Sequence, residues 1–213
     1  MNNEIELNLE GKDGRSIHLT ARPSLMHPEQ CAFQVSEPLF PDNSAHFPTR
    51  ESGQGSPLID KLFALGTIAD VLVSHDTIRA NLQGADASWD DVIPRVGAIV
   101  RDVMDSGEPA ISAAVAQNQL PAEEIQKRVG SVLETVINPA VAAHGGYVHL
   151  IEVANNTVFL EFGGGCQGCG MINVTLKYGV ERAIREEVPE VGDILDSTDH
   201  ASGRNPYYAP SSK

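Results

Sequence analysis

The sequence predicts an α+β fold, arranged as two small α/β-mixed domains. Pairs of short stretches with alternating hydrophobicity flank turn residues, which is typical of β-hairpins, and three longer stretches repeat apolar residues at helical period. With 213 residues the chain has room for one large or two small domains, and a polar, small-residue stretch after residue 110 separates two groups of elements. We therefore expect domains at 1–112 and 121–198, a linker at 113–120 and a flexible tail at 199–213.

The first domain is expected to contain two hairpins, a further strand and two helices. Alternation predicts strands at 4–10, 17–21, 31–35, 68–73 and 77–82. Residues 37–55 are rich in Pro, Ser, Asn and Gly, which predicts a long loop. Ser56 before Pro57 predicts the capped start of a short helix, and Ser88 predicts the start of a longer one. Cys31, alone in an apolar strand, is expected to be a core residue.

The second domain is expected to be a helix–β-hairpin–CxxC loop–helix–strand unit. An apolar stripe from Ile125 to Ile137, which includes Val136, predicts a first helix that is interrupted near Asn138-Pro139. Two β-rich runs, 147–153 and 157–162, meet at Asn155-Asn156 and predict a hairpin. Apolar residues then recur every four positions from 172 to 188, which predicts a helix ended by Pro189; residues 191–195 predict a short final strand.

The composition disfavours several classes of partner and location. Asp and Glu outnumber Lys and Arg by 29 to 15, giving a net charge of −14, which disfavours binding to nucleic acid or to anionic membranes. No apolar run approaches the roughly 20 residues of a transmembrane helix, and the first residues lack the features of a signal or transit peptide. We expect a cytoplasmic protein, in which a Cys-x-x-Cys motif is more often metal-binding or catalytic than a structural disulfide.

The motif that carries chemistry lies at 163–170, with the sequence Gly-Gly-Gly-Cys-Gln-Gly-Cys-Gly. Cys166 and Cys169 are two residues apart, so both sulfur atoms can face one small volume, and the five glycines leave room for a bulky group beside the backbone. The predicted helix that follows directs free N–H groups and the positive end of its dipole toward the loop, which favours thiolates. A soft metal, a metal–sulfur cluster and a redox disulfide all fit this motif.

Counting ligands indicates that the loop is half of a metal site. Zinc sites and iron–sulfur clusters usually take four protein ligands, and this loop supplies two. His144 and His149 are the other nearby candidates, and neither has metal-ligand spacing; the same holds for His18, His27 and His46. A two-fold homodimer, in which each chain contributes Cys166 and Cys169, completes the site most simply.

Three alternatives remain open from the residues alone: a thiol–disulfide oxidoreductase dithiol, a zinc site shared with a partner, and two structural cysteines. A thioredoxin-like dithiol lies in a βαβ context, whereas here a hairpin precedes the motif. Five glycines argue against a purely structural pair, because glycine loses conformational entropy on folding unless its freedom is used. An enzyme would need acid–base residues grouped beside a substrate pocket, and the sequence shows no such group.

A set of short motifs in the second domain occurs together in one known family. The motifs are Ile137-Asn138-Pro139, His144-Gly145-Gly146, Gly163 to Cys169, Thr175-Leu176-Lys177, Gly179-Val180-Glu181 and Val188-Pro189-Glu190. By these motifs and their spacing, residues 129–198 resemble the NifU C-terminal domain, also called the Nfu domain, of iron–sulfur cluster carrier (scaffold) proteins.

The first domain is similar to the Nfu N-terminal domain. This similarity rests on Arg22-Pro23 through Phe33, Ser56-Pro57-Leu58 with Leu62-Phe63, Trp89, and Ser106-Gly107-Glu108-Pro109. The family's usual Pro-Asn-Pro stretch is replaced here by Leu25-Met26-His27-Pro28.

The resemblance implies a non-enzymatic protein that holds a labile 4Fe-4S cluster across a homodimer. The cluster ligands implied are Cys166 and Cys169 of each chain. The family also implies apo iron–sulfur proteins as recipients of the cluster and an upstream cluster-assembly scaffold as its source. We expect the first domain, which has a core and no chemical cluster, to dock such partners.

Overall fold

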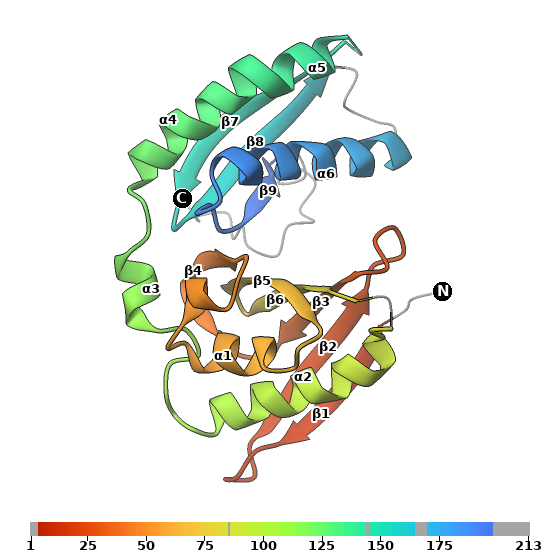
Figure 1. Ribbon diagram of the computed structural model, residues 1–213, viewed down its shortest axis with the longest axis vertical. Helices are drawn as coiled ribbons and strands as arrows, with labels where there is room; N and C mark the ends of the chain where they lie inside the picture. Colours follow the sequence, from red (N-terminus) through yellow and green to blue (C-terminus); the bar gives the residue numbers. More distant parts are fainter. Residues whose placement is uncertain (1–3, 85, 144, 165–169, 198–213) are drawn as a thin grey trace, which may run out of the picture. The chain divides into compact units, whose positions relative to one another are not determined.

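The computed structural model describes residues 4–84, 86–143, 145–164 and 170–197, and for 170–175 it describes the backbone alone. The chain forms two compact units, Met1–Gln119 and Leu120–Lys213, which we call unit 1 and unit 2 (Figure 1). Both units combine helices with a sheet, which confirms the predicted α+β fold. In the described residues, no helix combines the length and apolar character that crossing a membrane requires.

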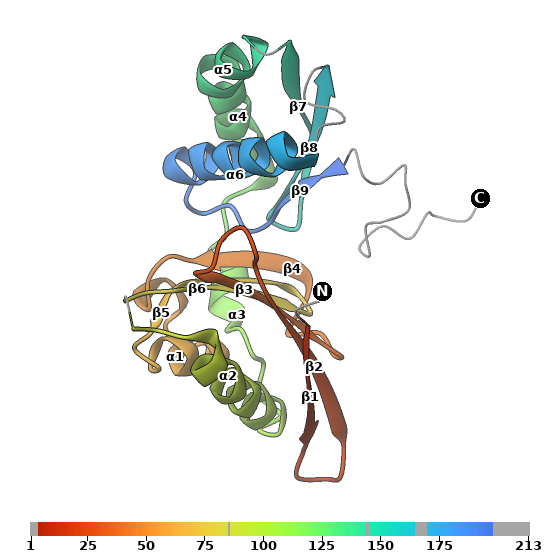
Figure 2. The ribbon, with the colours of Figure 1, turned by 90° about the vertical axis from the view of Figure 1, so that its right-hand side faces the viewer.

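Unit 1 is built on a six-stranded antiparallel sheet with the order β1-β2-β3-β6-β5-β4. The strands are β1 (Ile5–Glu10), β2 (Ser16–Pro23), β3 (Gln30–Val35), β4 (Phe40–Phe47), β5 (Ile68–His75) and β6 (Thr77–Leu82). Helices α1 (Pro57–Phe63) and α2 (Trp89–Met104) cover one face of this sheet (Figure 2). The two predicted hairpins, the strand that contains Cys31 and both predicted helices are therefore confirmed.

Strand β4 was not expected, because it lies within the predicted loop 37–55. Its apolar residues Phe40, Ala45 and Phe47 are buried in the core, and that burial decides its conformation. β4 is an edge strand that pairs only with β5, and the pairing shifts between Phe40 and Ser44. Proline is tolerated at a sheet edge or a bulge, so the polar, proline-containing composition misled the prediction.

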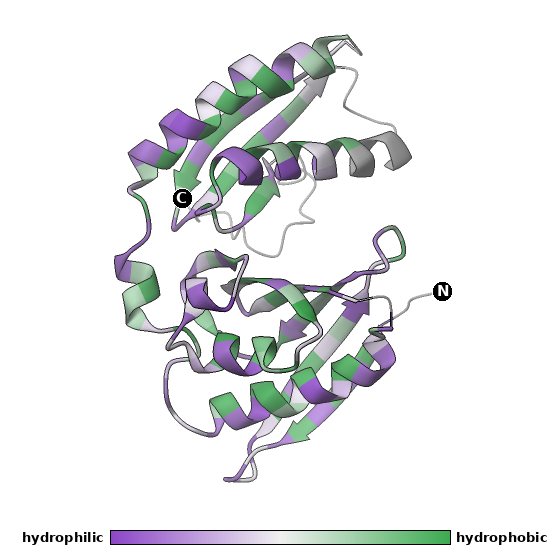
Figure 3. Ribbon diagram, in the orientation of Figure 1, coloured by the Kyte–Doolittle hydropathy of each residue, from purple (hydrophilic) through white to green (hydrophobic). Residues whose placement is uncertain are grey.

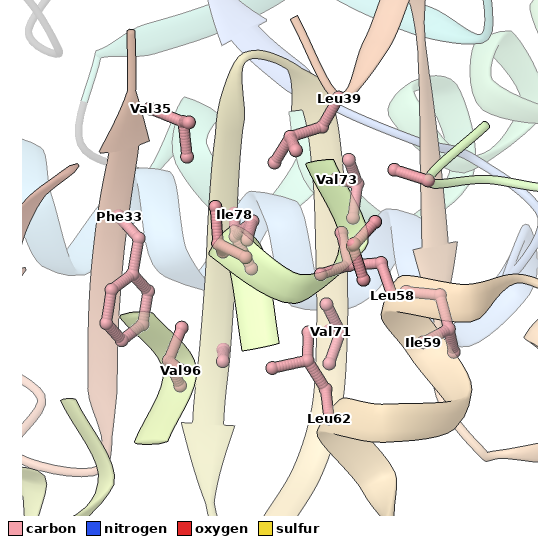
Figure 4. Packing of buried hydrophobic residues seen from close by; sticks show 14 of the residues in the cluster. Phe33, Val35, Leu39, Leu58, Ile59, Leu62, Val71, Val73, Ile78 and Val96 are labelled. Carbon is pink, nitrogen blue, oxygen red and sulfur yellow. The ribbon is translucent and has the colours of Figure 1, made fainter. Parts of the chain in front are cut away.

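The core of unit 1 lies between the sheet and its two helices. Figure 4 shows Phe33, Val71, Val73 and Ile78 from the sheet facing Leu58, Ile59 and Leu62 of α1 and Val96 of α2. Apolar residues recur along the strands and along the helices at the periods typical of each, and these periods are the ones from which the elements were predicted (Figure 3). Phe33 also meets the ring of Trp89 edge-on, with ring centroids 5.7 Å apart.

The two predicted capping serines have different roles. The Ser88 hydroxyl accepts a hydrogen bond from the Asp90 N–H at the start of α2, as expected for an N-cap. Ser56 precedes α1, but its hydroxyl accepts a hydrogen bond from the Ser112 N–H (3.0 Å) instead of capping α1. It therefore joins the start of α1 to the segment that leads into α3 (Ala113–Gln117), a short helix within the expected linker.

Unit 2 follows the predicted order of helix, hairpin, loop, helix and strand. Its elements are α4 (Ala122–Val132), a π-helical turn η2 (Leu133–Ile137), α5 (Asn138–Ala142), β7 (Gly146–Ala154), β8 (Thr157–Gly164), α6 (Gly170–Glu187) and β9 (Ile194–Asp196). β8 pairs antiparallel with β7 and parallel with β9. Helices α4 and α6 lie on one face of this three-stranded sheet (Figure 2).

The predicted interruption near Asn138-Pro139 takes the form of the π-helical turn η2. Pro139 has no N–H to donate and its ring crowds the carbonyl four residues earlier, and a wider turn relieves both problems. The turn also shifts the helical phase, so that Leu133, Ile137 and Val141 are buried. Val136, which was predicted to lie on the apolar stripe, is instead 51% exposed.

The hairpin turn and the described part of the last helix behave as predicted; Ile172, the first residue of the predicted stripe, has a side chain outside the described ones. Asn155 and Asn156 both have positive φ angles, 50° and 58°, as a two-residue type I′ turn requires. On α6, Val180 and Ile184 are buried, as is Val188 directly after the helix. The Arg185 guanidinium then donates to the carbonyl oxygens of Val191 (2.9 Å) and Gly192 (2.8 Å), which fixes the return of the chain toward β9.

A side-chain amide fastens the helical layer of unit 2 to the edge of its sheet. Asn138 Nδ2 donates to the carbonyl oxygen of Val148 (3.1 Å), and Asn138 Oδ1 accepts from the Val148 N–H (2.8 Å). Val148 is fully buried on β7, so these two backbone groups depend on the amide rather than on water.

We expect Asn138→Ala to lower the free energy of unfolding of unit 2 by roughly 2–3 kcal/mol, because it removes the side-chain partner of two buried backbone groups. Urea unfolding followed by far-UV circular dichroism measures the loss. Trp89, the single tryptophan, reports unit 1, so its fluorescence transition is expected to stay in place. The exposed Gln126→Ala serves as a control, within about 0.5 kcal/mol of wild type. An unchanged dichroism transition in Asn138→Ala would contradict this role.

Candidate metal centre

The predicted ligands lie between two elements of unit 2. Strand β8 ends at Gly164 and helix α6 begins at Gly170. Cys166 and Cys169 lie in the connecting residues 165–169, outside the described residues, so their role as ligands stays a prediction. The structure does define both ends of the loop that carries them.

The end of β8 is built around two glycines that no other residue could replace without rearrangement. Gly163 pairs with Tyr147 on β7, and the tyrosine ring lies so close over it that an added Cβ would overlap the ring and the phenolic oxygen. Gly164 has a φ of +65°, in the left-handed region, and an added Cβ there would overlap the carbonyl oxygen of Gly145. The base of the cysteine loop is therefore held in place by close contacts of these glycines with the Tyr147 ring and the Gly145 backbone.

The other end of the loop is the N-terminus of an 18-residue helix. The first N–H groups of such a helix lack intrahelical partners, and its dipole places positive potential there, which stabilises thiolates close to it. Lys177 fixes the helix against the sheet: its ammonium lies 2.6 Å from the Asp196 carboxylate of β9 and 5.9 Å from the centroid of the Phe162 ring of β8. Helix and strand are thus held at a defined separation where the loop joins them.

The other candidate ligands are not brought together. His144 lies outside the described residues. His149 lies on β7, with its ring centroid 4.8 Å from that of Tyr147, and its cross-strand neighbour is Glu161. Within the described ranges, no three His, Cys, Asp or Glu side chains gather closely enough to hold a metal ion.

The remaining histidines singled out in the sequence have ordinary partners. His18 contacts the Asn8 amide, His27 lies 3.5 Å from Glu29, and His46 lies 3.4 Å from Asp70. These contacts support the view that His18 and His27 are satisfied polar residues of unit 1, whereas the buried Nδ1 of His46 has no hydrogen-bond partner among the described residues.

Cys31 is a core residue, as predicted. It lies on β3 with no exposed surface, and burial raises the pKa of its thiol to about 12. A thiol with this pKa is almost entirely protonated at neutral pH, whereas metal ligation and nucleophilic attack both require thiolate. Cys31 therefore has neither the position nor the chemistry of a ligand.

Tyr147 is part of the site, although nothing in the sequence singled it out. It was assigned to a strand with no further role, although it covers the glycine that precedes the cysteine loop. The available signal was the register of the hairpin, which sets residues near 147 opposite residues near 163.

The fold and this site define a class of protein in which a small α+β domain presents a paired-cysteine loop between the end of a β-hairpin and a long helix. Residues 129–195 match the NifU-like domain, and residues 24–107 match the family described as scaffold protein Nfu/NifU N terminal. The chain therefore belongs to the Nfu/NifU family, with an Nfu N-terminal domain in unit 1 and a NifU-like domain in unit 2.

Several curated proteins are similar to parts of this chain. The Fe/S biogenesis protein NfuA of Pseudomonas aeruginosa is 45% identical over 105 residues, which are 48% of this chain and 54% of that protein. The protein of the same name from Pseudomonas savastanoi pv. phaseolicola is 50% identical over 88 residues (39% and 45%), and that of Azotobacter vinelandii is 46% identical over 83 residues (38% and 43%). The chain spans about half the length of the curated relatives it matches.

We expect Gly163→Ala to destabilise unit 2 by roughly 1–3 kcal/mol, because the new methyl group must displace the Tyr147 ring. Combining it with Tyr147→Ala should recover part of the loss, since the two residues are in contact and their effects are not additive. Urea unfolding by circular dichroism measures each variant. Gly130→Ala, where an added Cβ meets nothing within 4 Å, is the matched control and should not destabilise. Strict additivity of the two changes would show that Tyr147 and Gly163 do not interact.

We expect Cys31 to be inert toward alkylation in the folded protein. At pH 8 a thiol with a pKa of about 12 is only ~0.01% thiolate, and it is also shielded by the core. Iodoacetamide treatment followed by mass spectrometry should label no more than two of the three cysteines until the chain is unfolded in urea. Rapid native labelling of Cys31 would show that unit 1 opens far more readily than its core indicates.

Proposed function

We propose that this protein is an iron–sulfur cluster carrier. In this proposal a 4Fe-4S cluster is cargo, bound by Cys166 and Cys169 of one chain and by the same two residues of a second copy, and then passed to apo-proteins. The observation that carries the proposal is the ligand count at the loop: two cysteines per chain, with no described group of ligands nearby to complete a site. Membership of the Nfu/NifU family and relatives named for Fe/S biogenesis support it.

The ends of the loop suit the holding of an anionic cluster. The N-terminus of α6 favours thiolates, and the Gly163 and Gly164 contacts fix where the loop begins. Thiols must stay reduced to act as ligands, which the reducing cytosol provides.

Transfer in this proposal is ligand exchange. Each thiolate of the recipient forms one bond to iron as Cys166 or Cys169 breaks one, so the number of iron–sulfur bonds and the oxidation state of the cluster are unchanged. Only two ligands come from each chain, so a recipient can replace one chain at a time. No substrate is converted, and the protein acts as a carrier and not as an enzyme.

Unit 1 has a different role in this proposal. It has its own core, and its buried cysteine cannot serve as a ligand. We assign it the docking of partners, namely the upstream scaffold that supplies the cluster and the apo-proteins that receive it. Removing residues 1–119 should leave cluster loading intact and slow the transfer.

The main alternative is a thiol–disulfide oxidoreductase that uses the Cys166/Cys169 dithiol, and a zinc adaptor is a further one. Both use the same two residues, and chemical analysis separates them. A dithiol enzyme reduces insulin disulfides and cycles between dithiol and disulfide, and a zinc adaptor retains stoichiometric zinc after aerobic purification.

We expect anaerobic reconstitution of the full chain with iron and sulfide to give about two irons and two sulfides per chain, with visible absorption typical of a cluster. Cys166→Ala should reduce the iron bound to near background, because it removes half of the ligands from each chain. Cys31→Ala is the matched control and should load normally, since Cys31 is buried in the other unit. Iron binding that survives Cys166→Ala would rule out the proposed site.

A further inference from the structure

One stripe of side chains on the outer face of the unit 2 sheet is unusually apolar for an exposed surface. Tyr147 and Ile151 on β7 are 43% and 51% exposed, and His149 lies exposed between them. Val148, which points to the opposite side, is fully buried beneath the helices. We call Tyr147, His149 and Ile151 the β7 stripe. Exposed aromatic and aliphatic residues grouped in this way mark interaction surfaces more often than isolated ones do.

The edge of β7 is unsuited to pairing with another strand. The N–H and C=O of Val148 are already bound by the Asn138 amide. In addition, the pairing with β8 shifts between Leu150 and Glu152, so that Ile151 lies in a bulge. Bulges and side-chain plugs of this kind keep an edge strand from adding a neighbour. A partner of this strand is therefore expected to bind its outer face and not its edge.

The β7 stripe begins at the base of the cysteine loop. Tyr147 at one end of the stripe covers Gly163, and the loop that carries Cys166 and Cys169 starts two residues later. A protein that approaches the loop closely enough to share a ligand set with it must also come close to Tyr147.

We propose that the β7 stripe is the surface on which a second copy of this chain binds when the cluster is shared. This inference rests on the proposed function, because the two-cysteine site is incomplete without that copy. In a two-fold interface the same patch lies on both sides, so the stripe of each chain meets the stripe of the other. With the two-fold axis directed along β7, the two Tyr147 ends, beside which the cysteine loops start, meet as well. Aromatic residues such as Tyr147 are enriched at the centres of interfaces.

Charge limits where two copies of this chain can meet. Each chain carries a net charge of −14, so two copies repel except where carboxylates are few. The stripe itself contains no carboxylate, and the exposed Glu152 directly follows it on β7. Glu161 lies across the strand pair from His149, so a two-fold contact can set His149 of one copy beside Glu161 of the other.

The test compares Ile151→Glu with Val136→Glu in the full chain. Both positions are 51% exposed in unit 2, but Val136 lies on the π-helical turn and not on the stripe. Ile151→Glu should raise the dissociation constant of the cluster-loaded dimer about tenfold or more and lower iron per chain, as measured by anaerobic sedimentation equilibrium and iron analysis. Val136→Glu should match wild type in both. The unfolding midpoints of the two apo variants should stay close to wild type, which separates a lost interface from a lost fold.

A second measurement, made on the cluster-loaded protein, detects the contact itself and not the amount of iron bound. Benzoylphenylalanine in place of Ile151 should cross-link, on irradiation, to residues 147–151 of another chain, as identified by mass spectrometry. A cross-link to residues 198–213 or to unit 1 of the same chain would overturn the proposal and assign the stripe an internal partner.

The two hypotheses fail in different ways. Wild-type protein that binds no iron would overturn the proposed function. Wild-type protein that loads as a dimer while Ile151→Glu loads and dimerises equally well would leave that function standing and overturn the β7 stripe alone.

Discussion

The pairing of β7 with β8 is the constraint on which the rest of unit 2 depends. The turn at Asn155-Asn156 aligns the two strands, and the bulge at Ile151 then shifts their register by one residue. That shift sets Tyr147 over Gly163, where only a glycine leaves room for the ring. Because side chains alternate along a strand, the same register also determines which residues face α4 and α6 and which face outward. The register of this hairpin thus determines both where the cysteine loop starts and which side chains form the surface beside it.

The helices of unit 2 support this arrangement at both edges of the sheet. Asn138, at the start of α5, satisfies the edge of β7. Lys177 joins α6 to β8 and to β9, the strand at the opposite edge of the sheet. Since the loop is only five residues long between Gly164 and Gly170, fixing both flanking elements limits the positions that its two cysteines can reach. The proposed carrier function needs this combination, because ligands of a cluster that is passed on must be placed without enclosing it.

The two units differ in the size of their cores and in the cysteines they carry. Unit 1 has an extensive core under a six-stranded sheet, and its one cysteine is buried and protonated. Unit 2 is smaller and carries the paired cysteines. Such a division suits the proposed carrier function, since the recognition of partners could then vary without disturbing the proposed ligands. The acidic surface of the chain adds solubility and an electrostatic preference among partners.

The sequence by itself determined the fold class, most of the elements and the candidate ligands, because hydrophobic periods, turn residues and the spacing of Cys166 and Cys169 are local properties. Tertiary structure decided what depends on residues far apart in the chain. Burial of Phe40 and Phe47 made a strand from a segment with the composition of a loop. The π-helical turn before Pro139 moved Val136 from the core to the surface. Only the bulged register of the hairpin brought Tyr147 onto Gly163, because a one-residue slip cannot be read from an alternating pattern and changes every contact across the strands.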